Sequence, residues 1–178
     1  PDLIRKDLAF LESKGKCKKI YGGAILNRLN VHLEDANSRK SVNSKEKQKI
    51  AQMAYDLIEP NMTVFLDIST TNIELAKLLV LRPISGITVV TNMLDVIQIL
   101  STSQIHSIFI GGEFDYARNG FVGNMCDEFL QRFHFDLSFL GVVGIDLESG
   151  SVMTYMPNDG QTKRIVLNQS KKAYMLAD

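Results

Sequence analysis

Short apolar runs alternate with stretches of helical periodicity over most of the chain. The runs that predict strands lie near residues 63–66, 87–90, 105–110, 135–140 and 172–176. Amphipathic helices are predicted between them, near residues 72–80, 93–101, 123–133 and 159–169. Strand–helix alternation is typical of right-handed crossovers that build a parallel sheet with helices on both faces. The pattern therefore predicts an α/β fold for the larger part of the chain.

The first sixty residues have a different pattern. Apolar side chains share one face of a predicted helix over residues 4–13, and residues 16–26 suggest two short strands. Polar residues without periodicity fill residues 27–44 and are typical of a linker. A further amphipathic helix is predicted from Ser44 onward, and Pro60 ends it. Its apolar face would consist of Ile50, Met53, Ala54, Leu57 and Ile58.

Small polar or glycine residues follow four of the predicted strands. They are Asp67 to Thr71, Thr91-Asn92, Gly111-Gly112 and Gly144 to Asp146. The carboxyl ends of parallel strands meet at one edge of a sheet, and such an edge forms a binding crevice. Backbone N–H groups at a strand-to-helix turn, with the helix dipole behind them, suit a phosphate group. The alternative at the first turn is that Ser69 or Thr70 only caps the helix that follows.

Composition narrows the classes of function. The 178 residues, 45% of them hydrophobic, suffice for one main domain. Residues 1–20 carry six Lys or Arg against three acidic residues, although the formal net charge of the chain is zero. Cys17, Cys126 and three isolated His residues predict neither a disulfide framework nor a metal site. The chain lacks an initiator Met and stops just after a predicted strand, so we expect segments to be missing at both ends.

Several common signals are absent from the sequence. No signal peptide and no apolar run of membrane-spanning length occurs, so we expect a cytoplasmic protein without a membrane partner. No Gly-x-Gly-x-x-Gly follows a predicted strand, so dinucleotide binding is disfavoured and no cofactor is expected.

Short motifs follow one another in a specific order. The first two are Ile4-Arg5-Lys6-Asp7-Leu8 and Tyr21-Gly22-Gly23-Ala24. The later ones are Leu66 to Thr71, Val90-Thr91-Asn92, Ile110-Gly111-Gly112, Phe135-Asp136, Gly144-Ile145-Asp146, Lys163-Arg164 and Leu176-Ala177-Asp178. In this order they resemble the DeoR family of bacterial transcriptional regulators over nearly the whole chain. The first two resemble part of that family's recognition helix and the end of its wing, and the later series resembles its sensor domain.

The resemblance implies a domain organisation and a function. Residues 1–26 would be the C-terminal part of a DNA-binding winged helix-turn-helix, residues 27–43 a linker, and residues 44–178 an effector-binding sensor domain. The family's sensor domain resembles the sugar-phosphate isomerase fold, a Rossmann-like parallel sheet covered by helices. The implied protein is a homo-oligomeric regulator, commonly a repressor of sugar-metabolism genes, that binds operator DNA and a phosphorylated sugar effector.

The resemblance also implies effector-binding residues. Ser69, Thr70 and Thr71 would hold the phosphate, whereas Thr91, Asn92, Gly111 and Gly112 would contact the sugar hydroxyls. Asp67 and Asp146 would accept hydrogen bonds from hydroxyl groups, with Gly144 in the same crevice. Lys163 would supply a positive charge for the phosphate or an anionic oxygen.

Alternatives remain at several of these positions. Asp67 could cap its own turn, Gly111-Gly112 could be a tight connection, and Lys163 could be a solvated helix residue. Two positions depart from the family pattern, with Ser69 in place of Gly and Leu3 in place of Thr. Ser69 would restrict the turn if the backbone there needed a positive φ. Leu3 removes a hydroxyl group that could meet a DNA phosphate.

A sugar-phosphate isomerase is the alternative function. Such an enzyme needs a carboxylate base and a lysine that stabilises the enediolate. In the corresponding isomerase motif an acid directly precedes the lysine, whereas Thr162 precedes Lys163 here. Asp159 lies one helical turn away, but an Asp–Lys pair at i, i+4 is more simply a surface ion pair. We therefore expect a sensor without catalytic residues.

Basic residues near the N-terminus are candidates for DNA contacts. Arg5 and Lys6 could reach bases or phosphates from the recognition helix, and Lys16, Lys18 and Lys19 could contact the DNA backbone from the wing. The alternative is a solvated charged helix. Because one helix and wing cover few base pairs, we expect an oligomer that binds repeated half-sites.

Overall fold

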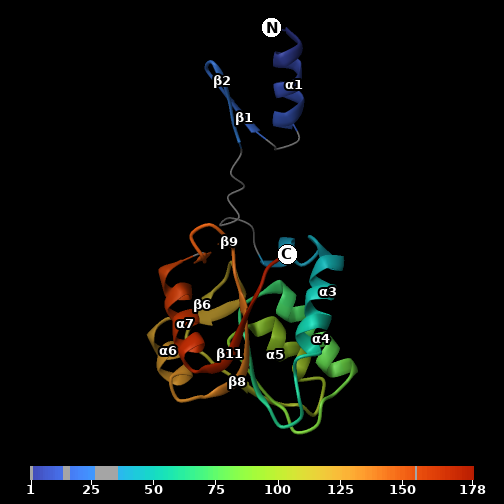
Figure 1. The fold of residues 1–178 in the computed structure, drawn as a ribbon, viewed down its shortest axis with the longest axis vertical. Coiled ribbons are helices and arrows are strands. Elements are labelled where there is room, and N and C mark those ends of the chain that lie inside the picture. The colour runs from blue at the N-terminus through green and yellow to red at the C-terminus, as the bar shows by residue number, and fades with distance from the viewer. Residues whose placement is uncertain (1, 14–16, 27–35, 155) are drawn as a thin grey trace. The chain divides into compact units, whose positions relative to one another are not determined.

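The computed structural model describes residues 2–13, 17–26, 36–154 and 156–178. The chain forms two compact units, Pro1–Glu34 and Asp35–Asp178 (Figure 1). The domain boundaries expected from the sequence remain predictions, and most of the expected linker lies outside the described residues.

The first unit contains a helix and a hairpin. They are α1 (Asp2–Ser13), β1 (Cys17–Ile20) and β2 (Gly23–Leu26). The strands are antiparallel, and Gly22 takes a positive φ of 86° in the two-residue turn between them. Cys17 is buried beside α1, and its thiol lies 3.7 Å from the Leu8 carbonyl oxygen. The helix and the two strands predicted from the sequence are confirmed.

The second unit is built on a five-stranded parallel sheet. Its strands are β3 (Thr63–Leu66), β4 (Thr88–Thr91), β5 (His106–Phe109), β8 (Phe135–Gly141) and β11 (Ser170–Leu176). They lie in the order β11-β8-β3-β4-β5 with all neighbours parallel. The chain runs outward from β3 to β5, then returns to the other side of β3. The strand order therefore reverses between β3 and β8, and this switch point is where α/β sheets bind ligands.

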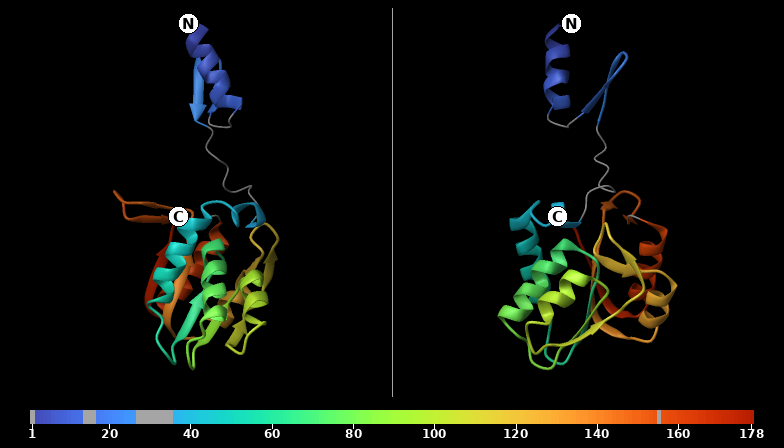
Figure 2. Two further views of the ribbon diagram at one scale, coloured as in Figure 1. Left: turned by 90° about the vertical axis from the view of Figure 1, so that its right-hand side faces the viewer. Right: turned by 180° about the vertical axis from the view of Figure 1, so that it is seen from behind.

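Helices cover both faces of this sheet, as predicted (Figure 2). One layer consists of α3 (Ser44–Tyr55), α4 (Thr70–Leu81) and α5 (Leu94–Leu100), and the other of α6 (Asn124–Leu130) and α7 (Pro157–Asn168). Strand β3 serves both layers because its side chains alternate between the faces. Val64 and Leu66 belong to the core under the first layer, whereas Phe65 belongs to the core under the second.

Several short elements were not predicted. They are α2 (Ala36–Arg39), the antiparallel hairpin of β6 (Glu113–Asp115) and β7 (Gly120–Val122), and the antiparallel hairpin of β9 (Gly144–Asp146) and β10 (Ser151–Met153). The hairpin strands have three residues each and α2 is a single turn, ANSR, so none of them shows an apolar run or a hydrophobic period. Among the described residues, no helix combines the length and apolar character that crossing a membrane requires.

The predicted apolar face of α3 was partly wrong. Met53 is 69% exposed, whereas Lys47 is only 2% exposed and shares the buried stripe with Ala51 and Ala54. A buried lysine is tolerated because its ammonium group lies 2.7 Å from a carboxylate oxygen of Asp178. The helix has therefore turned a charged residue inward, which the hydrophobic pattern could not show.

Candidate effector site

The carboxylate of Asp67 lies at the switch point between β3 and β8. Asp67 follows β3 and is fully buried, and its Oδ2 accepts a hydrogen bond of 3.0 Å from the backbone N–H of Gly141. Asn72 donates to the Asp67 and Phe139 carbonyl oxygens at 2.8 and 2.9 Å, so it ties the first turn of α4 to both strands. Gly141 has no room for a side chain, since an added Cβ would lie 2.6 Å from the Ser69 Cβ. The two strand ends are therefore packed directly against each other.

Ser69 is the N-cap of α4. Its hydroxyl oxygen accepts a hydrogen bond of 3.2 Å from the N–H of Thr71, so the capping role is real. The φ of Ser69 is −159°, an extended conformation that any residue adopts. The concern that Ser in place of Gly restricts this turn was therefore wrong. Thr70 and Thr71 begin the helix, and both are buried.

Lys163 of α7 lies between two carboxylates. Its Nζ is 2.9 Å from Asp67 Oδ2 and 2.5 Å from Asp159 Oδ1, and its side chain is only 12% exposed. Asp159 is buried and also accepts a hydrogen bond from the Thr154 hydroxyl. Lys163 is thus not a solvated helix residue, and the Asp159–Lys163 pair is not a surface ion pair. Both of those interpretations were wrong because the sequence did not show that α7 turns this face toward β3.

The charged groups of Asp67 and Lys163 shift each other's pKa. Burial raises the pKa of Asp67, although Lys163 opposes the shift. Burial alone would lower the pKa of Lys163, but Asp67 and Asp159 outweigh it, so the pKa of Lys163 lies above its usual value. The lysine therefore stays charged, with its charge already shared by two carboxyl groups.

Three buried acceptors at this edge lack hydrogen-bond donors among the described residues. They are Asp67 Oδ1, Asn72 Oδ1 and Asn92 Oδ1. Buried polar atoms are normally paired, so each of these oxygens is a place where an added donor would gain a hydrogen bond. All three side chains are fully buried, so a ligand reaches them only if neighbouring segments move.

Most of the other predicted residues at the ends of β4 and β5 have internal roles. Thr91 donates to the Leu66 carbonyl oxygen at 2.7 Å, and Asn92 donates to the Phe121 carbonyl oxygen at 2.9 Å. A Cβ on Gly112 would lie 2.7 Å from the Val122 carbonyl oxygen, so this glycine is a tight connection, whereas Gly111 is exposed. Direct sugar contacts by Thr91, Asn92 and the two glycines stay predictions.

The structure does not bring Gly144 and Asp146 into the cluster. Both lie in β9, and the Asp146 carboxylate accepts hydrogen bonds from the Glu148 N–H and the Ser149 hydroxyl. These bonds lower the pKa of Asp146, which is exposed. This carboxylate organises its own hairpin, and its predicted effector contact has no support in this geometry.

Thr162 is held by a carboxylate that sequence reasoning missed. Its hydroxyl donates to Asp127 Oδ1 at 2.7 Å, and both side chains are buried. Asp127 and Asn72 could have been noticed as polar residues at positions that helical periodicity turns inward. Arg118 was also missed. It is buried, pairs with Asp115, and lines a cavity of about 430 Å³ that reaches Asp159.

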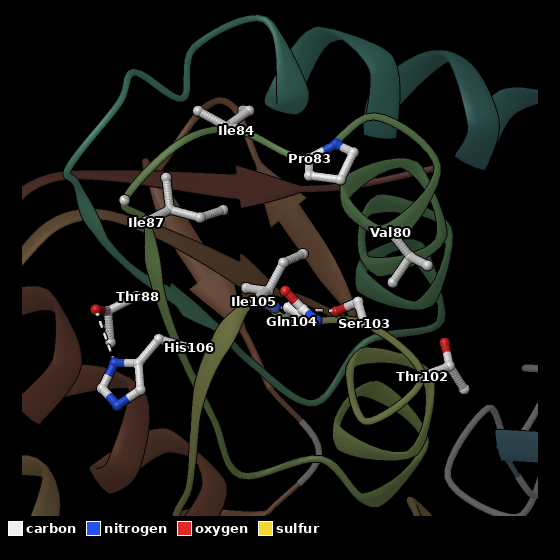
Figure 3. Close-up of a pocket in the computed structure, with 11 residues that line it drawn as sticks. Val80, Pro83, Ile84, Ile87, Thr88, Thr102, Ser103, Gln104, Ile105 and His106 are labelled. Carbon is white, nitrogen blue, oxygen red and sulfur yellow. Dashed lines mark hydrogen bonds between the residues drawn. The ribbon is translucent and has the colours of Figure 1, made fainter.

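Two further cavities differ in position. One of about 480 Å³ lies beside α7 and the end of β8, and Lys163, Arg164 and Thr154 contribute to its wall. The other, of about 660 Å³, lies at the amino ends of β4 and β5 (Figure 3). No Lys, Arg, Asp or Glu lines the latter, and the Thr88 hydroxyl lies 3.1 Å from the His106 ring. The cavities beside Lys163 and Asp159 therefore suit a polar ligand better.

The candidate DNA-contacting residues divide between two elements of the first unit. Arg5 and Lys6 are exposed on α1, and Lys18 and Lys19 are exposed on β1. Neighbouring side chains on a strand point to opposite faces, so Lys18 and Lys19 are not on one surface. Lys16 lies outside the described residues.

These features define an α/β domain with a buried lysine–carboxylate cluster at its switch point. The chain matches the family model for the DeoR C-terminal sensor domain over residues 42–178 and that for the DeoR-like helix-turn-helix domain over residues 2–29. It belongs to the DeoR family, as its motifs indicated.

Relatives of this chain are named as transcriptional regulators. It is 34% identical to the lactose phosphotransferase system repressor of Lactococcus lactis subsp. lactis, over 98% of this chain and 68% of the relative. It is 32% identical to the L-fucose operon activator of Haemophilus influenzae, over 99% of this chain and 70% of the relative. The chain spans 65% of the length of another relative, from Escherichia coli O157:H7. The expectation of a regulator rather than an enzyme is confirmed at the level of the family.

Solved structures show the same fold. Ribose 5-phosphate isomerase A from Methanocaldococcus jannaschii has a TM-score of 0.55 and 15% identity, over 76% of this chain and 53% of that chain. A D-ribose-5-phosphate isomerase in complex with phospho-erythronic acid has a TM-score of 0.56 and 16% identity, over 76% of this chain and 52% of that chain. At this identity the likeness concerns the fold alone, which confirms the predicted fold class.

Proposed function

We propose that this chain is part of a homo-oligomeric repressor of sugar-metabolism genes. Its sensor domain binds a phosphorylated sugar. The names of its relatives support the sugar operons as targets, and the helix-turn-helix match supports operator DNA as a partner. Arg5, Lys6, Lys18 and Lys19 are exposed, and we propose them for that contact.

The buried cluster of Lys163, Asp67 and Asp159 carries the effector proposal. Buried charges are costly and are expected where they serve a site or a partner. This cluster lies at the switch point, directly before the N-terminus of the twelve-residue α4. A helix start supplies backbone donors for a phosphate, and the cluster supplies donors and acceptors for hydroxyl groups.

The charges of the cluster determine where the phosphate and the hydroxyl groups of the ligand would bind. A phosphate placed on Lys163 would also approach two carboxyl groups at 2.9 and 2.5 Å from the ammonium nitrogen. Repulsion between like charges disfavours that arrangement. We therefore place the phosphate at Ser69, Thr70 and Thr71, and a sugar hydroxyl between Lys163 and Asp67.

Titration calorimetry on this chain tests the proposal. The ligands are ribose 5-phosphate, glucose 6-phosphate, fructose 1-phosphate and glycerol 3-phosphate, with the unphosphorylated compounds as controls. We expect binding only with the phosphate present. Thr70→Ala and Lys163→Gln should each weaken it by roughly 1–3 kcal/mol, as for losing a hydrogen bond to a charged group. Thr88→Ala, at the opposite edge of the sheet, is the matched control.

Two results would contradict the proposal. Equal affinity in Thr70→Ala, Lys163→Gln and the unmodified chain would remove the site assignment, and binding by none of the phosphorylated compounds would remove the effector class.

The isomerase alternative is disfavoured by the residue before Lys163. Thr162 is no base near neutral pH, and its hydroxyl is already bound to Asp127. We expect ribose 5-phosphate and ribulose 5-phosphate to interconvert at the uncatalysed rate in the presence of the chain. Turnover that disappears in Asp159→Asn would favour the enzyme instead.

A further inference from the structure

The segment that enters the second unit is fastened to the carboxyl edge of the sheet. Lys40 directly follows α2, and its Nζ lies 2.7 Å from Oδ1 of Asp95 in the first turn of α5. The lysine side chain is 35% exposed and the aspartate 13% exposed. Asp95 comes three residues after Asn92, so this ion pair joins the entering segment to the end of β4.

Asp95 also holds a third segment. Its Oδ2 accepts a hydrogen bond of 2.9 Å from the Asn119 side chain, and the Asn119 carbonyl oxygen accepts one of 3.0 Å from the Leu94 N–H. Asn119 has a positive φ of 55° in the turn between β6 and β7. One carboxylate therefore links the entering segment, the start of α5 and this turn.

The turn at Asn119 and Gly120 is closely packed against the candidate effector site. A Cβ on Gly120 would lie 2.5 Å from the Ile68 Cδ1 and 3.2 Å from the Asn92 carbonyl oxygen. Phe121 and Asn92 exchange two hydrogen bonds, of 2.8 and 2.9 Å. Ile68 lies between Asp67 and Ser69, so a displacement at either residue pushes on Gly120. Packed interiors transmit such displacements rather than absorb them.

A second ion pair, Lys47–Asp178, holds the start of α3 and differs from the Lys40–Asp95 pair in burial and position. The two pairs are called the Lys47 anchor and the Lys40 anchor. Lys47 Nζ lies 2.7 Å from Asp178 Oδ2 and 2.5 Å from the Val42 carbonyl oxygen, and this lysine is buried. Asp178 follows β11, at the other side of the sheet from β4. The Lys47 anchor therefore fixes the start of α3, whereas the Lys40 anchor is partly exposed, adjoins the effector site and is weak enough to be released.

We infer that the Lys40–Asp95–Asn119 contact couples the effector site to the segment leading to the DNA-binding unit. This inference rests on the proposed function. A ligand that reaches Asp67 and Asn92 moves Ile68 and Gly120, and the turn then carries Asn119 away from Asp95. The Lys40–Asp95 pair loses its alignment, and Lys40 shifts relative to α5 while Lys47 and the Val42 carbonyl oxygen that it holds stay in place. Effector and operator are thereby linked through two arrangements of one segment.

Hydrogen exchange of the ligand-free chain tests the contact itself. Lys40→Met should speed exchange at the amides of residues 38–42 by roughly fivefold or more, because local opening becomes easier. Asn119→Gly tolerates the positive φ and removes the side-chain bond to Asp95, and it should speed the same amides by roughly twofold or more. Lys49→Met, on the exposed side of α3, is the control and should change nothing there. Unchanged exchange at residues 38–42 in Asn119→Gly would overturn the inference.

The full-length regulator supplies the second test. Ribose 5-phosphate and glucose 6-phosphate are used as probes, at concentrations that saturate any shift of the melting temperature. Where a probe binds, it should change operator affinity in the unmodified protein and in Lys49→Met but by less than about twofold in Lys40→Met, with probe affinity retained. A full response in Lys40→Met would overturn the coupling. If no phosphorylated sugar binds at all, the proposed function fails, whereas the exchange experiment still decides the contact.

Discussion

Lysine–aspartate pairs lie at both edges of the sheet, and they differ in surroundings. At the carboxyl edge Lys163 contacts Asp67 with side chains 12% and 1% exposed, whereas at the amino edge Lys171 contacts Asp136 with side chains 78% and 27% exposed. In the buried pair, Lys163 also contacts a second carboxylate, that of Asp159. Three buried oxygens at this edge, one of them Asp67 Oδ1, lack a donor among the described residues. The exposed pair joins the start of β11 to that of β8, and Asp136 also accepts a hydrogen bond of 2.9 Å from the Thr63 N–H of β3. Burial, rather than the pairing itself, distinguishes the candidate site from a strand-end fastening.

Removing each lysine should give the largest difference between the edges. Lys163→Met leaves Asp67 and Asp159 buried without their cation, and we expect a loss of roughly 3–5 kcal/mol of unfolding free energy. Lys171→Met is the matched change at the exposed pair and should cost less than about 1 kcal/mol. Urea unfolding of both variants measures this, and equal losses would contradict the contrast.

Close packing at the switch point should be the next largest effect. In Gly141→Ala the new Cβ would lie 2.6 Å from the Ser69 Cβ and 2.8 Å from the Ile68 carbonyl oxygen, both held in place by the turn. We expect a loss of roughly 1–3 kcal/mol. Gly111→Ala, where nothing lies within 4 Å of an added Cβ, should change stability by less than about 0.5 kcal/mol. Thermal unfolding that ranks the two variants the other way would show that the strand ends are not tightly packed.

Loss of the α4 cap should have a smaller effect. Ser69→Ala removes the acceptor for the Thr71 N–H and should cost about 1 kcal/mol, whereas Ser69→Gly should cost only a few tenths. Chemical unfolding of the two variants gives the difference. A Ser69→Gly variant less stable than Ser69→Ala would argue that the serine side chain packs rather than caps.

The pH dependence of the exposed pair should be the smallest effect. Hydrogen bonds from Lys171 and from the Thr63 N–H hold the pKa of Asp136 below its usual value. A lowered pKa in the folded state gives stability that is present above the unfolded pKa and disappears as pH falls through the folded one. The stability advantage of the unmodified chain over Asp136→Asn should therefore shrink between roughly pH 5 and pH 2, by less than about 1 kcal/mol. An advantage that grows toward acid pH would contradict this assignment.

The strand and helix pattern was visible in the sequence because each long element buries one regular face. The polar residues after β3 and β4 were visible too, since they interrupt apolar runs. What the sequence could not show is which distant residues meet. Asp67 and Gly141 are 74 positions apart, and their contact depends on β8 returning beside β3 rather than beyond β5.

The sequence also did not show which charged residues of the helices are buried. Asp159 was interpreted as part of a surface ion pair, and Lys47 was not placed on the predicted apolar face, because hydrophobic periodicity assigns charges to the solvent side. Each is buried against an opposite charge, from Asp178 and Lys163, that lies on another element or another helical turn. The short hairpins near Gly120 and Gly144 were missed because neither contains enough residues for a period to appear.

Residue-resolved amide chemical shifts of the chain, followed during titration with ribose 5-phosphate, glucose 6-phosphate and fructose 1-phosphate, test the central claim most directly. We expect saturable shifts at Asp67 to Thr71, Asn92, Gly120 and Lys163, with little change at Thr88 and His106 beside the cavity of Figure 3. Saturable shifts confined to the amino edge, or none with any phosphorylated sugar, would contradict a sugar-phosphate site at the carboxyl edge of this sheet.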